Sequence, residues 1–385
     1  MTTENQYKYD YIIAGAGCAG LSLAMQLKIS GVSFNKILLI DKDLKNKNDR
    51  TWCFWTKQEK NWFDEVIFRR WDKFSFAGNG FEKTFDLAPY HYLMVQGIDF
   101  YDYCLSKLKS DPRFEIVTDT IEEIYTSENL AFLKTKNNAF CCEYLFNSAF
   151  RKLDKKTYQT NYVQHFKGWL IESSVSSFKS DCPVFMDFSI DQYHDCRFCY
   201  VLPFSDRKAL IEYTGFSTHA LKDEVYDTEL KKYIELNLGI REYRILSTEK
   251  GEIPMAESEF INLHGKRVIN IGTAGGSSKP STGYTFYFIQ KNIGYLVDQL
   301  KENRKQIIPQ KRKRRYLLYD SVLLDVINRK EILAATVFTG LFKNTLVKYL
   351  LAFLNEESNL KVDLQIMLAV PKKYFIKSML QKIIK

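Results

Sequence analysis

The sequence lacks any apolar run of the roughly 18 residues that a membrane-spanning helix needs, so we expect no segment that crosses a bilayer. Its eight cysteines show no paired spacing of the kind found in secreted domains, and the polar start MTTENQYKY is unlike a signal peptide. We therefore expect free thiols in a reducing cytoplasm. Cys196 and Cys199, close to His194, have no second cysteine pair to complete a zinc site, so we predict no metal.

Residues 1–300 also lack an excess of positive charge. The net charge is +9, but residues 301–385 hold 18 Lys and Arg against 7 Asp and Glu, whereas residues 1–300 hold 37 against 39. The densest basic stretch is KRKRR at 311–315. Beyond it, apolar residues recur at helical spacing. This predicts a basic helical segment that either contacts an anionic membrane surface or presents a solvated face.

The clearest local signal is YDYIIAGAGCAGLSLAMQLKISG at 9–31, followed by the strand-like KILLID at 36–41. Glycines at GxGxxG spacing between a strand and a helix allow a tight turn, close approach of a pyrophosphate and close helix packing. The helix N-terminus favours phosphate, and an acid after the second strand can bind a ribose. The predicted dinucleotide-binding residues are Gly15, Ala16, Gly17, Cys18, Ala19, Gly20 and Asp41.

The rest of the chain predicts two further layers. Residues 114–147 read as a small antiparallel meander, which is typical of FAD folds when it is inserted in a Rossmann-like sheet. Strand patterns at 183–190, 198–204 and 209–216 predict a substrate-binding sheet, the last two as a hairpin. A strand and glycine-rich loop at 267–290 suit the flavin end of the site. They add Thr273, Gly275, Gly276 and Gly283 to the cofactor residues.

We therefore predict an α/β fold in which a Rossmann-like FAD-binding domain with an inserted β-meander is joined to a mostly antiparallel substrate-binding sheet and a helical C-terminal segment. The first part of the FAD-binding domain is expected at 1–155 and its second part at 263–300. The substrate-binding sheet is expected at 156–262, and the basic helical segment at 301–385.

Glu212 lies in ALIEYTGFS (209–217), which otherwise reads as a buried strand. Period-two alternation places it on one face with Leu210 and Thr214, whereas Ile211 and Tyr213 point to the other. A buried, unpaired carboxylate is costly. Either an Arg or backbone amides satisfy Glu212, or the carboxyl keeps its proton because burial raises its pKa.

Three motifs in this order resemble the flavin-dependent lycopene cyclases, in particular the bacterial β-cyclases. They are DRTWCFW at 49–55, FMDF…YVLPFS…ALIEYTGFS at 185–217, and GTAGGSSKPSTGYTF at 272–286. The resemblance implies cyclisation of the ψ-end groups of lycopene to β-rings, started by a proton, without net oxidation but with reduced FAD. Glu212 falls on the first acidic position of that family's motif, and Tyr213 replaces the second.

The resemblance also implies the roles of individual residues. Glu212 would be the acid, and the deprotonating base is open among Asp187, Glu172, water and Glu212 itself. Trp52, Trp55 or nearby Phe residues would stabilise cations. Arg50, within the first motif, is assigned to the cofactor.

The partners that the resemblance implies are lycopene and related carotenoids, a membrane surface and no nucleic acid. NAD(P)H would be the reductant, and the protein would lie at the cytoplasmic face of the cell membrane. Two alternatives are a redox flavoenzyme of similar fold, either a monooxygenase or a polyprenyl reductase, and a non-catalytic flavin-binding protein.

Overall fold

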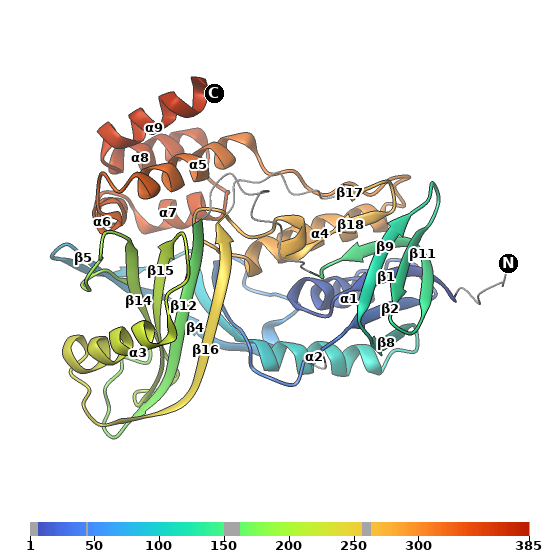
Figure 1. The fold of residues 1–385 in the computed structure, drawn as a ribbon, viewed down its shortest axis with the longest axis horizontal. Coiled ribbons are helices and arrows are strands. Elements are labelled where there is room, and N and C mark those ends of the chain that lie inside the picture. Colours follow the sequence, from blue (N-terminus) through green and yellow to red (C-terminus); the bar gives the residue numbers. More distant parts are fainter. Residues whose placement is uncertain (1–6, 44, 150–161, 256–262, 385) are drawn as a thin grey trace.

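The computed structural model describes residues 7–43, 45–149, 162–255 and 263–384. Figure 1 shows a Rossmann-like layer on the right, a large sheet on the left and a group of C-terminal helices above that sheet. The predicted α/β fold class is confirmed, including its antiparallel second sheet and its helical C-terminal segment. The predicted domain boundaries at 155 and 262 lie outside the described residues.

The Rossmann-like layer is built on five parallel strands in the order β18-β11-β1-β2-β8. Their bounds are β1 (Tyr7–Ala14), β2 (Ile37–Asp41), β8 (Phe114–Thr118), β11 (Ala139–Asn147) and β18 (Val268–Asn270). One apolar core joins this layer to α1 (Cys18–Ser30), α2 (Gly97–Lys109) and α4 (Phe286–Lys301). β17 (Leu263–His264) pairs with β18 at one edge.

The inserted meander is smaller than predicted. Its antiparallel part among the described residues is β9 (Ile121–Thr126), which pairs with β10 (Ala131–Thr135), and β10, which pairs with β11. The first predicted meander strand, β8, instead pairs in parallel with β2, because it follows helix α2 and extends the parallel layer.

The second sheet has the order β16-β12-β15-β14-β13-β5-β6. Its strands are β5 (Lys73–Gly78), β6 (Phe81–Asp86), β12 (Tyr162–Ser173), β13 (Val184–Asp187), β14 (Cys196–Pro203), β15 (Lys208–Ser217) and β16 (Tyr243–Met255). The predicted hairpin is formed by β14 and β15. Two strands of this sheet, β5 and β6, come from within the predicted first part of the FAD-binding domain. A separate small sheet has the strand order β3 (Thr51–Thr56), β7 (His91–Gln96) and β4 (Ile67–Trp71). The short helix η1 (Asp64–Val66) directly precedes β4 in the chain.

The two faces of the second sheet pack against different helices. One face meets α3 (Asp223–Lys232) and the π-helical turn η3 (Tyr233–Asn237). The other shares a core with the C-terminal helices at the top left of Figure 1. These are α5 (Arg314–Arg329), α6 (Ala334–Asn344), α7 (Val347–Leu354), α8 (Leu360–Ala369) and α9 (Lys372–Ile384). Among the described residues, no helix combines the length and apolar character needed to cross a bilayer.

Candidate active site

The first glycine-rich turn lies between β1 and α1. Gly15 has φ +102°, and the backbone N–H of Ala16 donates to Asp41 Oδ2 at 2.6 Å. A Cβ on Gly20 would lie 1.9 Å from the Gly15 carbonyl oxygen, so only glycine permits this close packing. A Cβ on Gly17 would meet nothing within 4 Å, so open space borders the N-terminus of α1, where Cys18 and Ala19 begin the helix. This arrangement fits a bound pyrophosphate.

The second glycine-rich loop reaches the same place. After β18 it forms the short 3-10 helix η4 (Gly272–Gly275), which includes Thr273. A Cβ on Gly272 would lie 2.6 Å from the Cβ of Ala19, so this loop packs directly on the start of α1. Gly276 and Gly283 both have positive φ, and Gly283 lies against the side chain of Gln164. The Gln164 Oε1 atom is buried without a hydrogen-bond partner, which leaves a polar atom for a cofactor to satisfy.

Glu212 lies opposite a second glutamate that sequence reasoning missed. On β12, Gly168 is the register partner of Glu212 on one side and of Glu249 on the other. The two carboxyl side chains hydrogen-bond each other across the position where residue 168 has no side chain. Thr214 donates to Glu212 Oε1 at 2.7 Å, and Thr51 donates to Glu249 Oε2 at 2.8 Å. We call Glu212 and Glu249 the carboxyl pair.

The carboxyl pair holds a proton well above the ordinary pH range of a glutamate. Burial raises the pKa of Glu212, and the negative charge of Glu249 raises it further, while the Thr214 hydroxyl opposes the rise. Burial also raises the pKa of Glu249, against the hydrogen bond from Thr51 and the charge of Arg50. Among the residues that the structure describes, neither an arginine nor a backbone amide is a partner of Glu212, so its carboxyl is the kind that stays protonated.

An apolar cavity of about 280 Å³ lies between the second sheet and the C-terminal helices. Its wall includes Tyr200, the register partner of Glu212, so the carboxyl pair lies next to a residue of the cavity wall. Tyr200 and Tyr284 hydrogen-bond each other, and both are close enough to feel the charge of Glu212. The wall is rich in aromatic side chains, among them Phe185, Tyr200, Phe216, Tyr284, Phe338 and Phe342. Such a space suits a hydrocarbon.

A profile of the lycopene cyclase protein family matches residues 10–381. The chain belongs to the lycopene cyclase family. A comparison with curated protein sequences gives no match.

Solved structures show the same fold at low identity. A geranylgeranyl bacteriochlorophyll reductase-like protein from Thermoplasma acidophilum is 13% identical, covering 97% of this chain and 99% of its own, with a TM-score of 0.68. A flavoprotein/dehydrogenase from Cytophaga hutchinsonii is 12% identical over 97% and 99%, with a TM-score of 0.63. A halogenase solved in complex with FAD is 13% identical over 89% and 78%, with a TM-score of 0.55. Likeness at this level supports the flavoprotein-type fold of this lycopene cyclase family member.

Asp187 does not lie with the carboxyl pair. Asp187 is the register partner of Cys199, and Cys199 is in turn the register partner of Tyr213. Cys199 and Tyr213 belong to the core that packs against α3, so the side chain of Asp187 is on the α3 face of the sheet. There its carboxylate accepts a hydrogen bond from Tyr233 at 2.7 Å. Alternation along β13 thus turns Asp187 away from the Glu212 face, and its catalytic role stays a prediction.

Glu172 is also excluded from the centre of the site. It lies four residues along β12 from Gly168 and forms ion pairs with Lys208 and Arg244. These two partners, Arg244 first, lower the pKa of Glu172, so it is an ionised surface group. Cys196 and Cys199, the two members of the Cys-x-x-Cys pair, are both buried but lie on opposite faces of β14. In the described part of the chain, no group of three or more candidate ligands is placed to hold a metal ion.

The tryptophans of the first motif divide between the two cores. Trp55 contacts Phe185 and Tyr284, which line the apolar cavity, and its Nε1 donates to the Leu351 carbonyl oxygen at 3.1 Å. Trp52 packs in the core beside α2 and α4 instead. Trp55 is thus the one of the two that supports the cavity wall of this lycopene cyclase family member.

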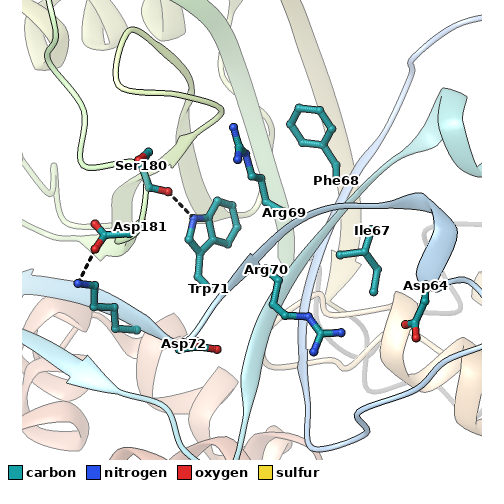
Figure 2. Close-up of a pocket in the computed structure, with 10 residues that line it drawn as sticks. Asp64, Ile67, Phe68, Arg69, Arg70, Trp71, Asp72, Ser180 and Asp181 are labelled. Carbon is teal, nitrogen blue, oxygen red and sulfur yellow. Dashed lines mark hydrogen bonds and ion pairs between the residues drawn. The ribbon is translucent and has the colours of Figure 1, made fainter.

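Another hollow, of about 790 Å³, lies along β4 and the start of β5 (Figure 2). Charged side chains such as Arg69 and Arg70 border it, and the Trp71 Nε1 donates to the Ser180 carbonyl oxygen at 2.9 Å. An ion pair between Lys73 and Asp181 at 2.6 Å closes one side. Its polar lining makes it a poor site for a hydrocarbon.

A buried ion-pair network connects the second glycine-rich loop to the C-terminal helices. Lys279 contacts Asp320 at 2.7 Å and Glu356 at 3.2 Å, and Arg312 contacts the same two carboxylates. All but Arg312 are almost fully buried. Two of the five basic residues at 311–315, Arg312 and Arg315, are thus engaged with internal carboxylates, Arg315 with Asp363.

Proposed function

We propose that this protein is a lycopene β-cyclase, an isomerase that converts the ψ-end groups of lycopene to β-rings and gives γ-carotene and β-carotene. The observation that carries the proposal is the place of Glu212, paired with Glu249 and next to Tyr200 in the aromatic wall of an apolar cavity, where burial raises the pKa of its carboxyl. An acid that keeps its proton in a dry site can protonate an alkene. Membership of the lycopene cyclase family supports the same reaction.

In this scheme Glu212 donates its proton to the terminal double bond of the ψ-end. The neighbouring double bond attacks the tertiary cation, the six-membered ring closes, and one proton leaves the ring. One proton enters and one departs, so the reaction has no net oxidation. The faces of Tyr200, Tyr284 and Trp55 would stabilise the cations, because aromatic rings attract positive charge.

The two glycine-rich loops fit FAD as the cofactor. Gly15, Gly17 and the N-terminus of α1 would hold its pyrophosphate, Asp41 its ribose, and the 272–276 loop its ring system. Reduced FAD, kept reduced by NAD(P)H, would supply negative charge that favours the cations. Arg50, just before β3, would contact the cofactor from the side of the small sheet.

The test is expression of the chain in a bacterial host that accumulates lycopene, with pigments separated by chromatography. We expect γ-carotene or β-carotene from the native chain and unchanged lycopene from Glu212→Gln. The variant must retain bound flavin, as judged by its absorption spectrum, for its loss of product to count. Unchanged lycopene from flavin-loaded native protein would reject the cyclase proposal in favour of a redox flavoenzyme, which would consume NAD(P)H with each turnover.

We also propose that the outer face of α8 and α9 contacts the cytoplasmic surface of the cell membrane, where lycopene and related carotenoids dissolve. Leu360, Leu364 and Leu368 form one exposed stripe on α8, and Ile376 and Leu380 form another on α9. Leu368 and Ile376 also border the apolar cavity, which would admit an end group of the long substrate directly from lipid. Lysines 361, 372, 373 and 382 complement an anionic lipid surface.

This surface can be tested by flotation with vesicles that contain anionic lipid. We expect Leu364→Glu to reduce the bound fraction severalfold, because it places a charge in the apolar stripe. Ile29→Glu is the matched control, since Ile29 on α1 and Leu364 are both 57% exposed. Equal flotation of both variants would reject this surface.

A further inference from the structure

Gly168 leaves a gap in the second sheet over which two carboxyl groups meet. A Cβ at this position would lie 3.2 Å from Glu249 Cγ and 3.0 Å from Leu210 Cδ1, tighter than most contacts allow. The strands on both sides of β12 place a glutamate at the same register and on the same face. The gap therefore lets side chains from two strands that are not neighbours share a hydrogen bond.

We propose that Glu249 is a positioning residue for the acid: together with Glu212 it holds one shared proton across the gap at Gly168. The proposal rests on the proposed function for its consequence in catalysis. The shared proton itself can be measured without lycopene, so the two can fail separately.

The surroundings decide which member of the carboxyl pair carries the charge. The Thr51 hydroxyl donates to Glu249, and the positive charge of Arg50 also favours its ionised form, although Asp49 opposes it. Within the described ranges, Glu212 has only the Thr214 hydroxyl in addition to its partner Glu249. The proton therefore resides on Glu212, and the Glu249 carboxylate accepts its hydrogen bond.

Apart from Arg50 and Asp49, the titratable groups that surround the carboxyl pair stay neutral at physiological pH. Burial is the first cause of a raised pKa in each of them, so none of them releases a proton or supplies positive charge. They are Cys53, Tyr92, Tyr200 and Tyr284. The carboxyl pair thus carries a single negative charge, with the acidic hydrogen fixed in direction by Glu249.

A shared proton suits a reaction that takes up one proton and releases one. When Glu212 gives its proton to the alkene, two neighbouring carboxylates are left, and their repulsion favours return of a proton to the pair. The pair then ends each turnover with the charge with which it began. No oxidant, reductant or further acid is needed for this step.

The test compares Glu249→Gln with Glu252→Gln, the same substitution on the same strand at an exposed residue of the opposite face. Infrared spectroscopy of the flavin-loaded protein follows the carbonyl stretch of a protonated carboxyl as pH rises. We expect this band to disappear at a lower pH in Glu249→Gln than in the native chain, because the neighbouring negative charge is gone. In Glu252→Gln it should disappear at the same pH as in the native chain. The band should be absent from Glu212→Gln throughout.

With lycopene as substrate, the upper pH limit of cyclisation should move down by the same amount in Glu249→Gln. In Glu249→Asp, which keeps the charge, the upper pH limit should lie between that of Glu249→Gln and that of the native chain. A purely structural role for Glu249 would lower the stability of the variant and leave both pH limits in place, and that outcome would overturn the proposal. A moved infrared band in a protein that forms no carotene would uphold the shared proton and reject the cyclase.

Discussion

Two pairs of carboxyl groups lie near the apolar cavity, one buried and one partly exposed, and they are compensated in different ways. Asp320 and Glu356 face two cations, Lys279 and Arg312, in the buried ion-pair network. The carboxyl pair at Gly168 has hydroxyl groups and a shared proton in place of such contacts. Both arrangements avoid the cost of unpaired buried charge, but by different means.

The way in which a carboxyl group is compensated indicates whether its role is structural or catalytic. A carboxylate held between cations stays ionised and fixes the elements that supply its partners, here the 272–286 loop, α5 and the turn before α8. A carboxyl compensated by a proton keeps an acidic proton that it can transfer to a substrate. Burial alone does not distinguish the two cases, whereas the identity of the neighbouring groups does.

The largest expected effect follows from removing a cation from the ion-pair network. Lys279→Met leaves two buried carboxylates with one arginine, so we expect a loss of about 3–5 kcal/mol in the free energy of unfolding. Denaturation by urea measures it. Lys311→Met is the control, because Lys311 is an exposed residue of the same basic segment and should change stability by less than about 0.5 kcal/mol. Equal stability of the two variants would show that the network is not structural.

A smaller and opposite effect is expected at the carboxyl pair. Because the pKa of Glu212 in the folded protein lies above its ordinary value of 4.5, the folded state binds this proton more tightly than the unfolded state. Its contribution to stability is therefore complete at low pH and is lost as pH rises from 4.5 through the raised pKa. Glu212→Gln cannot titrate, so it should gain stability relative to the native chain over this range.

The gain should be about 1.4 kcal/mol for each unit by which the pKa is raised. Urea denaturation of the native chain, Glu212→Gln and Glu252→Gln over a series of pH values measures it, with the last variant expected to follow the native curve. A constant difference between the native chain and Glu212→Gln at all pH values would mean that folding does not change the pKa of Glu212.

Much of the fold could be predicted from the sequence because local patterns determine it. The glycine spacing at 15–20 and the alternation at 209–217 act over a few residues, and both correctly indicated their elements. The face of Glu212 was also readable from alternation. The face on which Asp187 lies could not be read in this way, because a short strand with a register shift decides which way its side chain points.

Glu249 could not be found in this way. It lies 37 residues after Glu212 in a strand whose pattern, ILSTEKGEIP, gives no sign of burial, and only the pairing of three strands brings it to the acid. The signal that does exist is Gly168, an interior glycine in a long strand, which often marks a close approach. Arg312 was likewise hidden within a basic run, since charge density does not tell a solvated face from an internal ion pair.

The smallest expected effect comes from filling the gap at Gly168. In Gly168→Ala the new Cβ meets two flexible side chains, at Leu210 Cδ1 and Glu249 Cγ, each of which must shift by a few tenths of an ångström. The hydrogen bond within the carboxyl pair should lengthen, with kcat for cyclisation reduced by about tenfold or less, since small misplacement of an acid weakens proton transfer. Gly294→Ala is the control, because its Cβ has room on α4. If Gly168→Ala lowers stability without lowering kcat or the upper pH limit, the gap serves packing alone, and the carboxyl pair would then resemble the ion-pair network more than it differs from it.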